Sequence, residues 1–172
     1  ERGKEIRKAF VPRDDEHLIL AADYSQIELR IIASLAGDRH MIEAFTHGYD
    51  IHAATAAKIY GIPLEEVSKD QRRNAKSVNF GIVYGISAFG LSEQLGIARK
   101  EAAALIEEYF AQYPDIKRFI DGCIAQAHER GYAATMLGRR RYLYDINSRN
   151  AGLRSFAERN AVNMPIQGTS AD

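Results

Sequence analysis

Apolar residues recur every three or four positions along two stretches of this chain, over 102–110 and over 116–124. A spacing close to 3.6 residues places them on one face, so both stretches are predicted to be long amphipathic helices. Pro114 lies between them and should separate them, and Asp115 is expected to cap the second helix.

Shorter helical patterns precede these two. Ser25 and Glu28 have the spacing of a capping box ahead of an apolar run, which predicts a helix that ends at Gly37. One or two helical turns are expected over 41–45. A further helix is expected from Asp50, as its cap, to Tyr60, before a glycine.

Few stretches favour strands. The apolar run 18–22 predicts a short buried strand that ends at Asp23, and the alternation over 132–144 predicts a β-hairpin. A last helix is expected over about 151–163, where Pro165 kinks or ends it. The pattern is therefore mainly helical, with a minor β component.

One helix, predicted over 70–85, carries a distinctive stripe. Arg72, Lys76, Phe80 and Tyr84 recur every four residues, and the stripe rises about 18 Å at 1.5 Å per residue. Cations come first and aromatics second, which suits a ligand with an anionic end and a flat end, such as a nucleoside triphosphate. The alternative is a surface helix whose apolar residues, Val78 among them, face the core.

Composition narrows the class of protein. The chain has 172 residues, of which 46% are hydrophobic and 27% charged, as in ordinary globular proteins. The formal net charge is +0, so nucleic-acid binding has to rest on local patches. The single cysteine excludes an internal disulfide and indicates a reducing compartment. We expect neither a membrane span nor a signal peptide, because no apolar run approaches about 18 residues.

Several polar residues are candidates for chemistry, each with a simpler alternative. Asp23, at a strand end, suits Mg²⁺ held together with substrate phosphates, or it only turns the chain. Glu28 is equally explained by the capping box, and Gln26 by exposure to solvent. His52, next to a capping aspartate, is ordinarily an exposed or capping histidine.

The C-terminal third contains two polar patterns. Arg159, Asn163 and Gln167 recur every four residues, and such side chains suit hydrogen bonds to groove-edge acceptors and sugar-phosphate, although Pro165 bends the stripe. Three arginines, 139–141, are predicted at the hairpin turn, where they either touch phosphates or are solvated.

Three of these stretches together resemble DNA polymerase family A. The octapeptide DYSQIELR at 23–30 looks like its motif A, RRNAKSVNFGIVYG at 72–85 looks like its motif B, and 159–172 is similar to its primer–template contact segment. The resemblance covers essentially the whole chain, with the motifs in the family's order. It implies an α/β, mainly helical fold: the fingers and part of the palm of a right-hand polymerase.

The resemblance also implies a division of the chain and a set of partners. Residues 1–40 would form part of the palm, 41–131 the fingers, and 132–172 a hairpin and helix that return to the palm. The partners would be primer–template DNA and dNTPs. The complete enzyme would be a monomer in the cytoplasm of a bacterium, or of a bacterium infected by a phage.

Roles near the triphosphate follow from the same resemblance. Asp23 and the Tyr24 carbonyl would hold Mg²⁺, two ions in the complete enzyme. Arg72, Lys76 and His52 would bind the triphosphate, with Lys76 as proton donor to the pyrophosphate.

Roles near the sugar, base and duplex are implied in the same way. Phe80 would pack on sugar and base, Tyr84 would stack at the insertion site, and Gln26 would belong to the substrate-binding residues. Glu28 would exclude a ribose 2′-hydroxyl. Gly81 and Gly85 would let a base pair or template strand approach the helix. The residues that would follow the minor groove of the primer–template are Arg159, Asn163 and Gln167.

The family's motif C, a His-Asp-Glu turn with the second metal-binding carboxylate, has no counterpart, since no His-Asp dipeptide occurs in the sequence. The chain begins at Glu1 without methionine and reads as a segment of a longer protein, which we expect to be inactive alone. Two alternatives remain: a nucleotide- or DNA-binding module without turnover, and a relative of single-subunit RNA polymerases. Glu28 argues against the second alternative.

Overall fold

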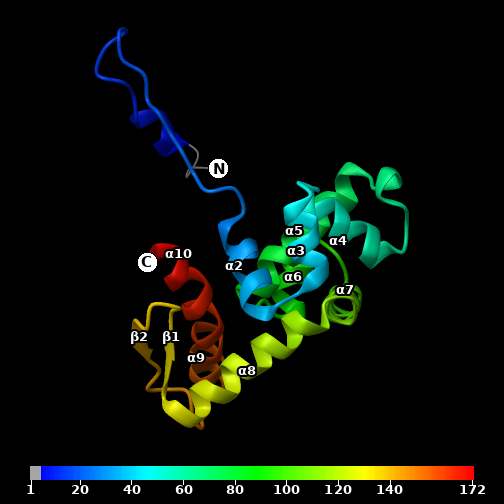
Figure 1. The fold of residues 1–172 in the computed structure, drawn as a ribbon, viewed down its shortest axis with the longest axis vertical. Coiled ribbons are helices and arrows are strands. Elements are labelled where there is room, and N and C mark those ends of the chain that lie inside the picture. The colour runs from blue at the N-terminus through cyan, green and yellow to red at the C-terminus, as the bar shows by residue number, and fades with distance from the viewer. Residues whose placement is uncertain (1–4) are drawn as a thin grey trace.

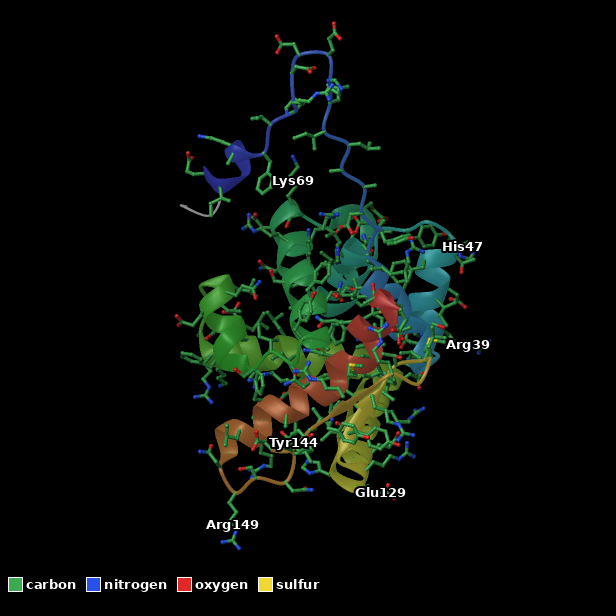
Figure 2. The ribbon with its side chains drawn as sticks, turned by 90° about the vertical axis from the view of Figure 1, so that its left-hand side faces the viewer. Arg39, His47, Lys69, Glu129, Tyr144 and Arg149 are labelled. Carbon is green, nitrogen blue, oxygen red and sulfur yellow. The ribbon has the colours of Figure 1, made fainter. Side chains whose placement is uncertain are left out.

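The computed structural model describes residues 5–172 as a body of packed helices with one small hairpin (Figure 1). An N-terminal segment, which includes the short helix η1 (Arg7–Ala9), extends away from this body. In the side view of Figure 2, Lys69 lies at the end of the body nearest that segment, and Tyr144 and Arg149 lie at the opposite end.

The strand predicted over 18–22 does not form. This run is extended and solvated, with Leu18 94% and Leu20 92% exposed. A strand needs a neighbour that satisfies its backbone N–H and C=O groups. Within residues 5–172 the paired strands are those of the hairpin, and they bond to each other. The prediction of a mainly helical chain is correct, whereas the buried strand was wrong.

The helices before the hairpin follow local signals closely. Asp38 accepts a hydrogen bond from the Met41 amide at 2.8 Å, and Asp50 accepts from the amides of residues 52 and 53, so each caps a helix as its N-terminal residue. Gly37 and Gly61 end helices with φ of 67° and 62°. The elements in this part are α2 (Ile27–Ala36), α3 (Arg39–Thr46), α4 (Ile51–Tyr60), η2 (Leu64–Glu66) and α5 (Lys69–Val83).

The capping box predicted at the start of α2 differs from the structure. The residue before α2 is Gln26, in the left-handed conformation with φ 55°, so the Ser25–Glu28 box does not form in the described chain. A capping box instead begins α5, where the Gln71 amide donates to Ser68 Oγ at 3.2 Å and the Ser68 amide donates to Gln71 Oε1 at 2.9 Å.

The two long helices form as predicted, after the short helix α6 (Ala88–Leu95). They are α7 (Arg99–Gln112) and α8 (Pro114–Arg130). Asp115 is not the cap of α8. Pro114 takes the first helical position, where a residue without an N–H costs nothing, and Asp115 instead pairs with Arg118 at 2.9 Å.

The C-terminal part is a hairpin beside a helix (Figure 1). Strands β1 (Tyr132–Ala134) and β2 (Arg140–Tyr142) pair antiparallel, with Ala133 opposite Arg141. Helix α9 (Ala151–Asn163) continues into a wider π-helical turn, η3 (Met164–Gly168), and then α10 (Thr169–Ala171). The α-helix ends at Asn163, which confirms the predicted effect of Pro165, because proline cannot donate to the α-helical ladder.

Two apolar clusters hold these elements together. The larger contains residues of every α-helix from α2 to α9 and of η3. It buries Val78, Ile82 and Val83, which form the apolar face of α5. The smaller joins α8 to α9 through Leu143 and Ile146, which follow the hairpin. Each fully buried Leu, Ile or Val contributes about 1.5–3 kcal/mol. The polar face of α5 is thereby turned outward, with Arg72 and Lys76 exposed.

Candidate functional site

The N-terminal half of α5 is tied to the start of α4. Arg72 Nε donates to Asp50 Oδ2 at 2.6 Å, and the same carboxylate caps α4. Burial alone would raise the pKa of Asp50, but the Arg72 hydrogen bond and charge and two backbone amides outweigh it, so this pKa is lowered. One turn further along α5, Lys76 is exposed, with its Nζ 6.0 Å from the centroid of the Phe80 ring.

The C-terminal half of the stripe is aromatic. The Phe80 and Tyr84 rings stack with centroids 6.5 Å apart and planes 16° apart. The His52 ring lies 5.7 Å from Phe80 at a tilt of 45°. The predicted stripe is therefore one surface on which cations give way to flat rings.

Tyr84 connects this surface to α2. Its hydroxyl donates to Glu28 Oε2 at 2.6 Å, across 56 positions of sequence. The pKa of Tyr84 is raised, first by this hydrogen bond and then by burial and the Glu28 charge, while the Gln167 side chain acts in the opposite direction. Glu28, Tyr84 and Gln167 thus meet from three elements, and the local capping role of Glu28 was wrong.

A cavity of about 270 Å³ opens beside this hydrogen bond. Its lining consists of the start of α2, the residues before it and the two rings of α5: Asp23, Tyr24, Gln26, Ile27, Glu28, Phe80 and Tyr84. The predicted metal ligands, Asp23 and Tyr24, are exposed at its edge. Mg²⁺ takes one or two carboxylates together with phosphates. Asp23 fits as one carboxylate ligand of such a site. Residues 5–172 contain no group of three or more His, Cys, Asp or Glu side chains that could hold a metal ion by themselves.

His52 is buried, with 2% exposure, so the expectation of an exposed or capping histidine was wrong. Its Nδ1 lies 3.0 Å from Asn79 Nδ2. Burial lowers the pKa of His52 to about 4, against the pull of Asp50 and with help from the charges of Arg72 and Lys76. The imidazole is therefore neutral at pH 7.

A second cavity, of about 400 Å³, connects α5 to α9. It is lined by glycines and rings at the end of α5, by the start of α6 and by one arginine of α9: Phe80, Gly81, Tyr84, Gly85, Ile86, Ser87, Gly90, Gln94 and Arg159. Arg159 is exposed and donates to Ser155 Oγ at 3.1 Å, while Asn163 and Gln167 are half-buried. The structure therefore brings Arg159 and Gln167 to the aromatic half of α5.

The glycines of this region serve the protein's own side chains. A Cβ on Gly81 would lie 2.7 Å from Ile86 Cγ2, and one on Gly85 would lie 2.8 Å from Arg159 Cγ. Gly85 lies beyond α5 with φ +68°. The expectation that these glycines give a base pair access to the helix stays a prediction: both line the second cavity, and Ile86 and Arg159 are the side chains closest to them.

Gly85→Ala should therefore lower the free energy of unfolding by about 1–2 kcal/mol, because a Cβ is disfavoured at positive φ and meets Arg159. Gly122→Ala, inside α8 with open space around it, is the matched control and should gain about 0.5–1 kcal/mol. Denaturant unfolding measures both. Equal effects of the two substitutions would contradict the strained position of Gly85.

The three arginines do not share the hairpin turn. Arg140 and Arg141 lie in β2, and only Arg139 lies outside the strand. Arg139 pairs with Asp172 at 2.5 Å, and the Arg140 guanidinium lies 4.7 Å from the centroid of the Tyr132 ring. Two of the three cations thus have partners within the protein.

Sequence reasoning missed Asn79 and Thr55, both fully buried and hydrogen-bonded to each other at the back of α5. The available signal was a polar residue next to Val78 on the apolar face of α5. Such residues are buried only when paired. Asn79 and Thr55 are 24 positions apart in the sequence, so their hydrogen bond had no local signature.

Comparison with known proteins places this helical fold among the polymerases. A sequence model of DNA polymerase family A matches residues 1–172. The polymerase domain of Pol1 from M. smegmatis, solved in complex with DNA primer-template and dNTP, superposes with a TM-score of 0.81 at 44% identity, over 87% of this chain and 26% of that one. The chain belongs to DNA polymerase family A.

The curated relatives are bacterial DNA polymerase I proteins. Identity is 56% with that of Geobacillus stearothermophilus, over 100% of this chain and 20% of that protein. It is 54% with that of Pseudomonas aeruginosa, over 99% of this chain and 18% of that protein. The chain thus spans about a fifth of their length. In the part of the chain that the structure describes, each helix is too short or too polar to cross a membrane.

The family resemblance and the mainly helical fold are therefore confirmed. The division at residues 40 and 131 and the roles of individual side chains stay predictions.

Proposed function

We propose that this chain forms the fingers and part of the palm of a DNA polymerase, which transfers dNTPs to a primer 3′-hydroxyl under direction of a template. The observation that carries the proposal is the 2.6 Å hydrogen bond from Tyr84 to Glu28. It joins the two motif-like segments at one cavity, where Asp23 is also found. The M. smegmatis relative was solved with the corresponding partners, primer-template and dNTP.

The dNTP would lie along α5. Arg72 and Lys76 are exposed cations and would bind the triphosphate, with neutral His52 beside them. Phe80 and Tyr84 would contact the sugar and base. The Lys76 ammonium would neutralise charge on the departing pyrophosphate and donate a proton to it, a role that general acids perform in such transfers.

Asp23 and the Tyr24 carbonyl would bind Mg²⁺ at the edge of the cavity. The ion supplies positive charge at the reacting phosphate when bound. Asp23 is one carboxylate, and a two-ion site requires a second. The other carboxylate at this cavity, Glu28, accepts from the Tyr84 hydroxyl and is assigned to the sugar. In this proposal, the cavity residues orient the sugar and the triphosphate relative to Asp23.

The primer–template would lie across α9 and η3. Arg159, Asn163 and Gln167 would donate to minor-groove acceptors shared by all base pairs, which permits binding independent of sequence. The approach of Gln167 to Tyr84 supports this placement, because it joins the proposed duplex surface to the proposed nucleotide surface.

The isolated 172-residue chain should not extend a primer, because it supplies only one of the two carboxylates that the proposed reaction uses. The measurement is gel-based primer extension with Mg²⁺ and four dNTPs, with the full-length polymerase as positive control. Extension by the isolated chain would overturn this expectation. Lack of extension by the full-length protein would overturn the proposed function itself.

A nucleotide-binding module without turnover is the second candidate. It is favoured because, among residues 5–172, Asp23 is the only carboxylate at the cavity that is not engaged by a partner there, since Glu28 accepts from Tyr84. It predicts that the full-length protein binds dNTPs and primer–template but releases no pyrophosphate. A pyrophosphate-release assay on the full-length protein therefore separates the two candidates.

A further inference from the structure

A series of buried polar side chains runs from the core to His52. It consists of Tyr113, Thr55, Asn79 and His52, which are 1%, 0%, 0% and 2% exposed. They come from the α7–α8 junction, from α4 and from α5. A buried polar group is costly unless it is hydrogen-bonded. Which atom of the Asn79 amide faces His52 therefore decides the role of the His52 ring in this series.

The Thr55 hydroxyl donates one hydrogen bond and accepts two. Its hydroxyl has one proton, and Oγ1 lies 2.8 Å from the Ile51 carbonyl oxygen one turn earlier, closer than the 3.2 Å to Asn79 Oδ1. With its proton donated to Ile51, Oγ1 can only accept from its other neighbours. It accepts from Asn79 Nδ2 at 3.1 Å and from the Tyr113 hydroxyl at 3.2 Å, which uses both lone pairs.

Thr55 Oγ1 lies 3.1 Å from Asn79 Nδ2 and 3.2 Å from Asn79 Oδ1, so the contact to His52 depends on the orientation of the Asn79 amide, which places Nδ2 toward the ring. Asn79 Nδ2 carries two hydrogens, one of them donated to Thr55, and the same nitrogen lies 3.0 Å from His52 Nδ1. His52 Nδ1 is therefore an acceptor. In a neutral imidazole one nitrogen accepts and the other carries the proton, so the proton is on Nε2.

The Nε2 atom is not sealed in the core. Within residues 5–172 the side-chain hydrogen bond of the His52 ring is the one at Nδ1. The buried side-chain atoms without a partner are the Tyr109 hydroxyl and Asn163 Oδ1. Because His52 Nε2 is not among these buried atoms, it retains access to solvent. The ring also packs beside Phe80, on the nucleotide face of α5. The Nε2–H group is thus the polar end of the series on the side of the proposed nucleotide site.

We propose that Asn79, held by Thr55 and Tyr113, is a positioning residue that keeps the His52 proton on Nε2, so that His52 donates a neutral hydrogen bond to a phosphate oxygen of the incoming dNTP. Arg72 and Lys76 already supply two positive charges here. A neutral donor adds a directed hydrogen bond without placing a third charge in a desolvated position. The identity of the ligand rests on the proposed function, whereas the tautomer does not.

The tautomer can be read directly in the full-length polymerase labelled with ¹⁵N-histidine. The ring signals of His52 are identified by their loss in His52→Gln. We expect a pyrrole-type Nε2 and a pyridine-type Nδ1 at pH 7.5. The reverse pattern, or a mixture, would overturn the inference even if the enzyme extends primers. The spectrum stays informative even if the enzyme does not extend primers, so the two failures are distinguishable.

Substitutions test the consequence for binding. Asn79→Leu removes the donor at similar volume and should weaken dNTP binding about tenfold, with a smaller effect on the rate of addition at saturating dNTP. If Asn79→Leu does not fold, Thr55→Val, which keeps the shape of Thr55, should give a mixed tautomer and a weaker dNTP affinity. An unchanged dNTP affinity in a folded variant would overturn the proposal.

Two further comparisons separate positioning from mere packing. Tyr113→Phe should weaken dNTP binding about threefold, whereas Tyr109→Phe, which removes a buried hydroxyl without a partner, should not. In a His52→Gln background, Asn79→Leu should have no further effect on dNTP affinity. Equal effects of the two tyrosine substitutions, or additive effects of the His52 and Asn79 substitutions, would show a structural role only.

Discussion

Replacing Asp23 with asparagine in the full-length polymerase should lower the rate of nucleotide addition at least about a thousandfold, with little change in protein stability. Asp23 is exposed at the edge of the cavity shared by Glu28 and Tyr84. An amide keeps its size but removes the charge that binds Mg²⁺. Metal ions contribute several kcal/mol to such reactions, and each 1.36 kcal/mol is a factor of ten in rate.

Single-turnover primer extension measures this effect, over a range of Mg²⁺ concentrations. Asp15→Asn is the matched control, because Asp15 is an exposed aspartate of the same N-terminal segment, outside the cavity. It should leave the rate unchanged. An Asp23→Asn enzyme within tenfold of the parent rate would contradict the assignment of Asp23 as a metal ligand.

Glu28→Ala should increase ribonucleotide incorporation relative to deoxyribonucleotide incorporation by about a hundredfold, the range of discrimination that the shape of a pocket provides. The Glu28 carboxylate is held in place by the Tyr84 hydroxyl at 2.6 Å and lines the cavity beside Phe80. A 2′-hydroxyl on the bound sugar would compete with that carboxylate for space. Alanine leaves the space empty and releases Tyr84.

The measurement is the ratio of kcat/KM for each dNTP and its matching rNTP. Tyr84→Phe removes the hydrogen bond but keeps both the ring and the Glu28 carboxylate, so it should preserve most of the discrimination. Glu43→Ala, an exposed glutamate of α3, should not affect the ratio. Unaltered sugar selectivity in Glu28→Ala would contradict the role of Glu28 in excluding a ribose 2′-hydroxyl. It would also remove the reason for rejecting a relationship to single-subunit RNA polymerases.

The helices of this chain could be predicted because their signals are local. Asp50 caps the helix that follows it, and Gly37 and Gly61 end helices in the left-handed conformation, all within a few residues of the helix they control. The stripe from Arg72 to Tyr84 was equally accessible, because a four-residue spacing on an α-helix determines a common face. The motif order then indicated the family, which the family match confirms.

Features that depend on distant partners could not be predicted in the same way. The apolar run 18–22 has the composition of a strand, but a strand forms only where another backbone pairs with it. Glu28 matched a capping box, yet its carboxylate accepts from Tyr84, the residue that caps the C-terminus of α5. Local spacing offered two equally good roles for this side chain, and the packing of α2 on α5 selected one.

The sequence by itself determined the helical architecture, the order of cations and rings along α5, and the family. The tertiary structure alone decided the state of His52, which local pattern placed in solvent and which packing buries as a neutral ring bonded to Asn79. It also decided that Gly81 and Gly85 accommodate Ile86 and Arg159. The physical reason is the same in each case: burial and hydrogen-bond partners depend on residues far apart in the chain, whereas helical periodicity and caps depend on neighbours.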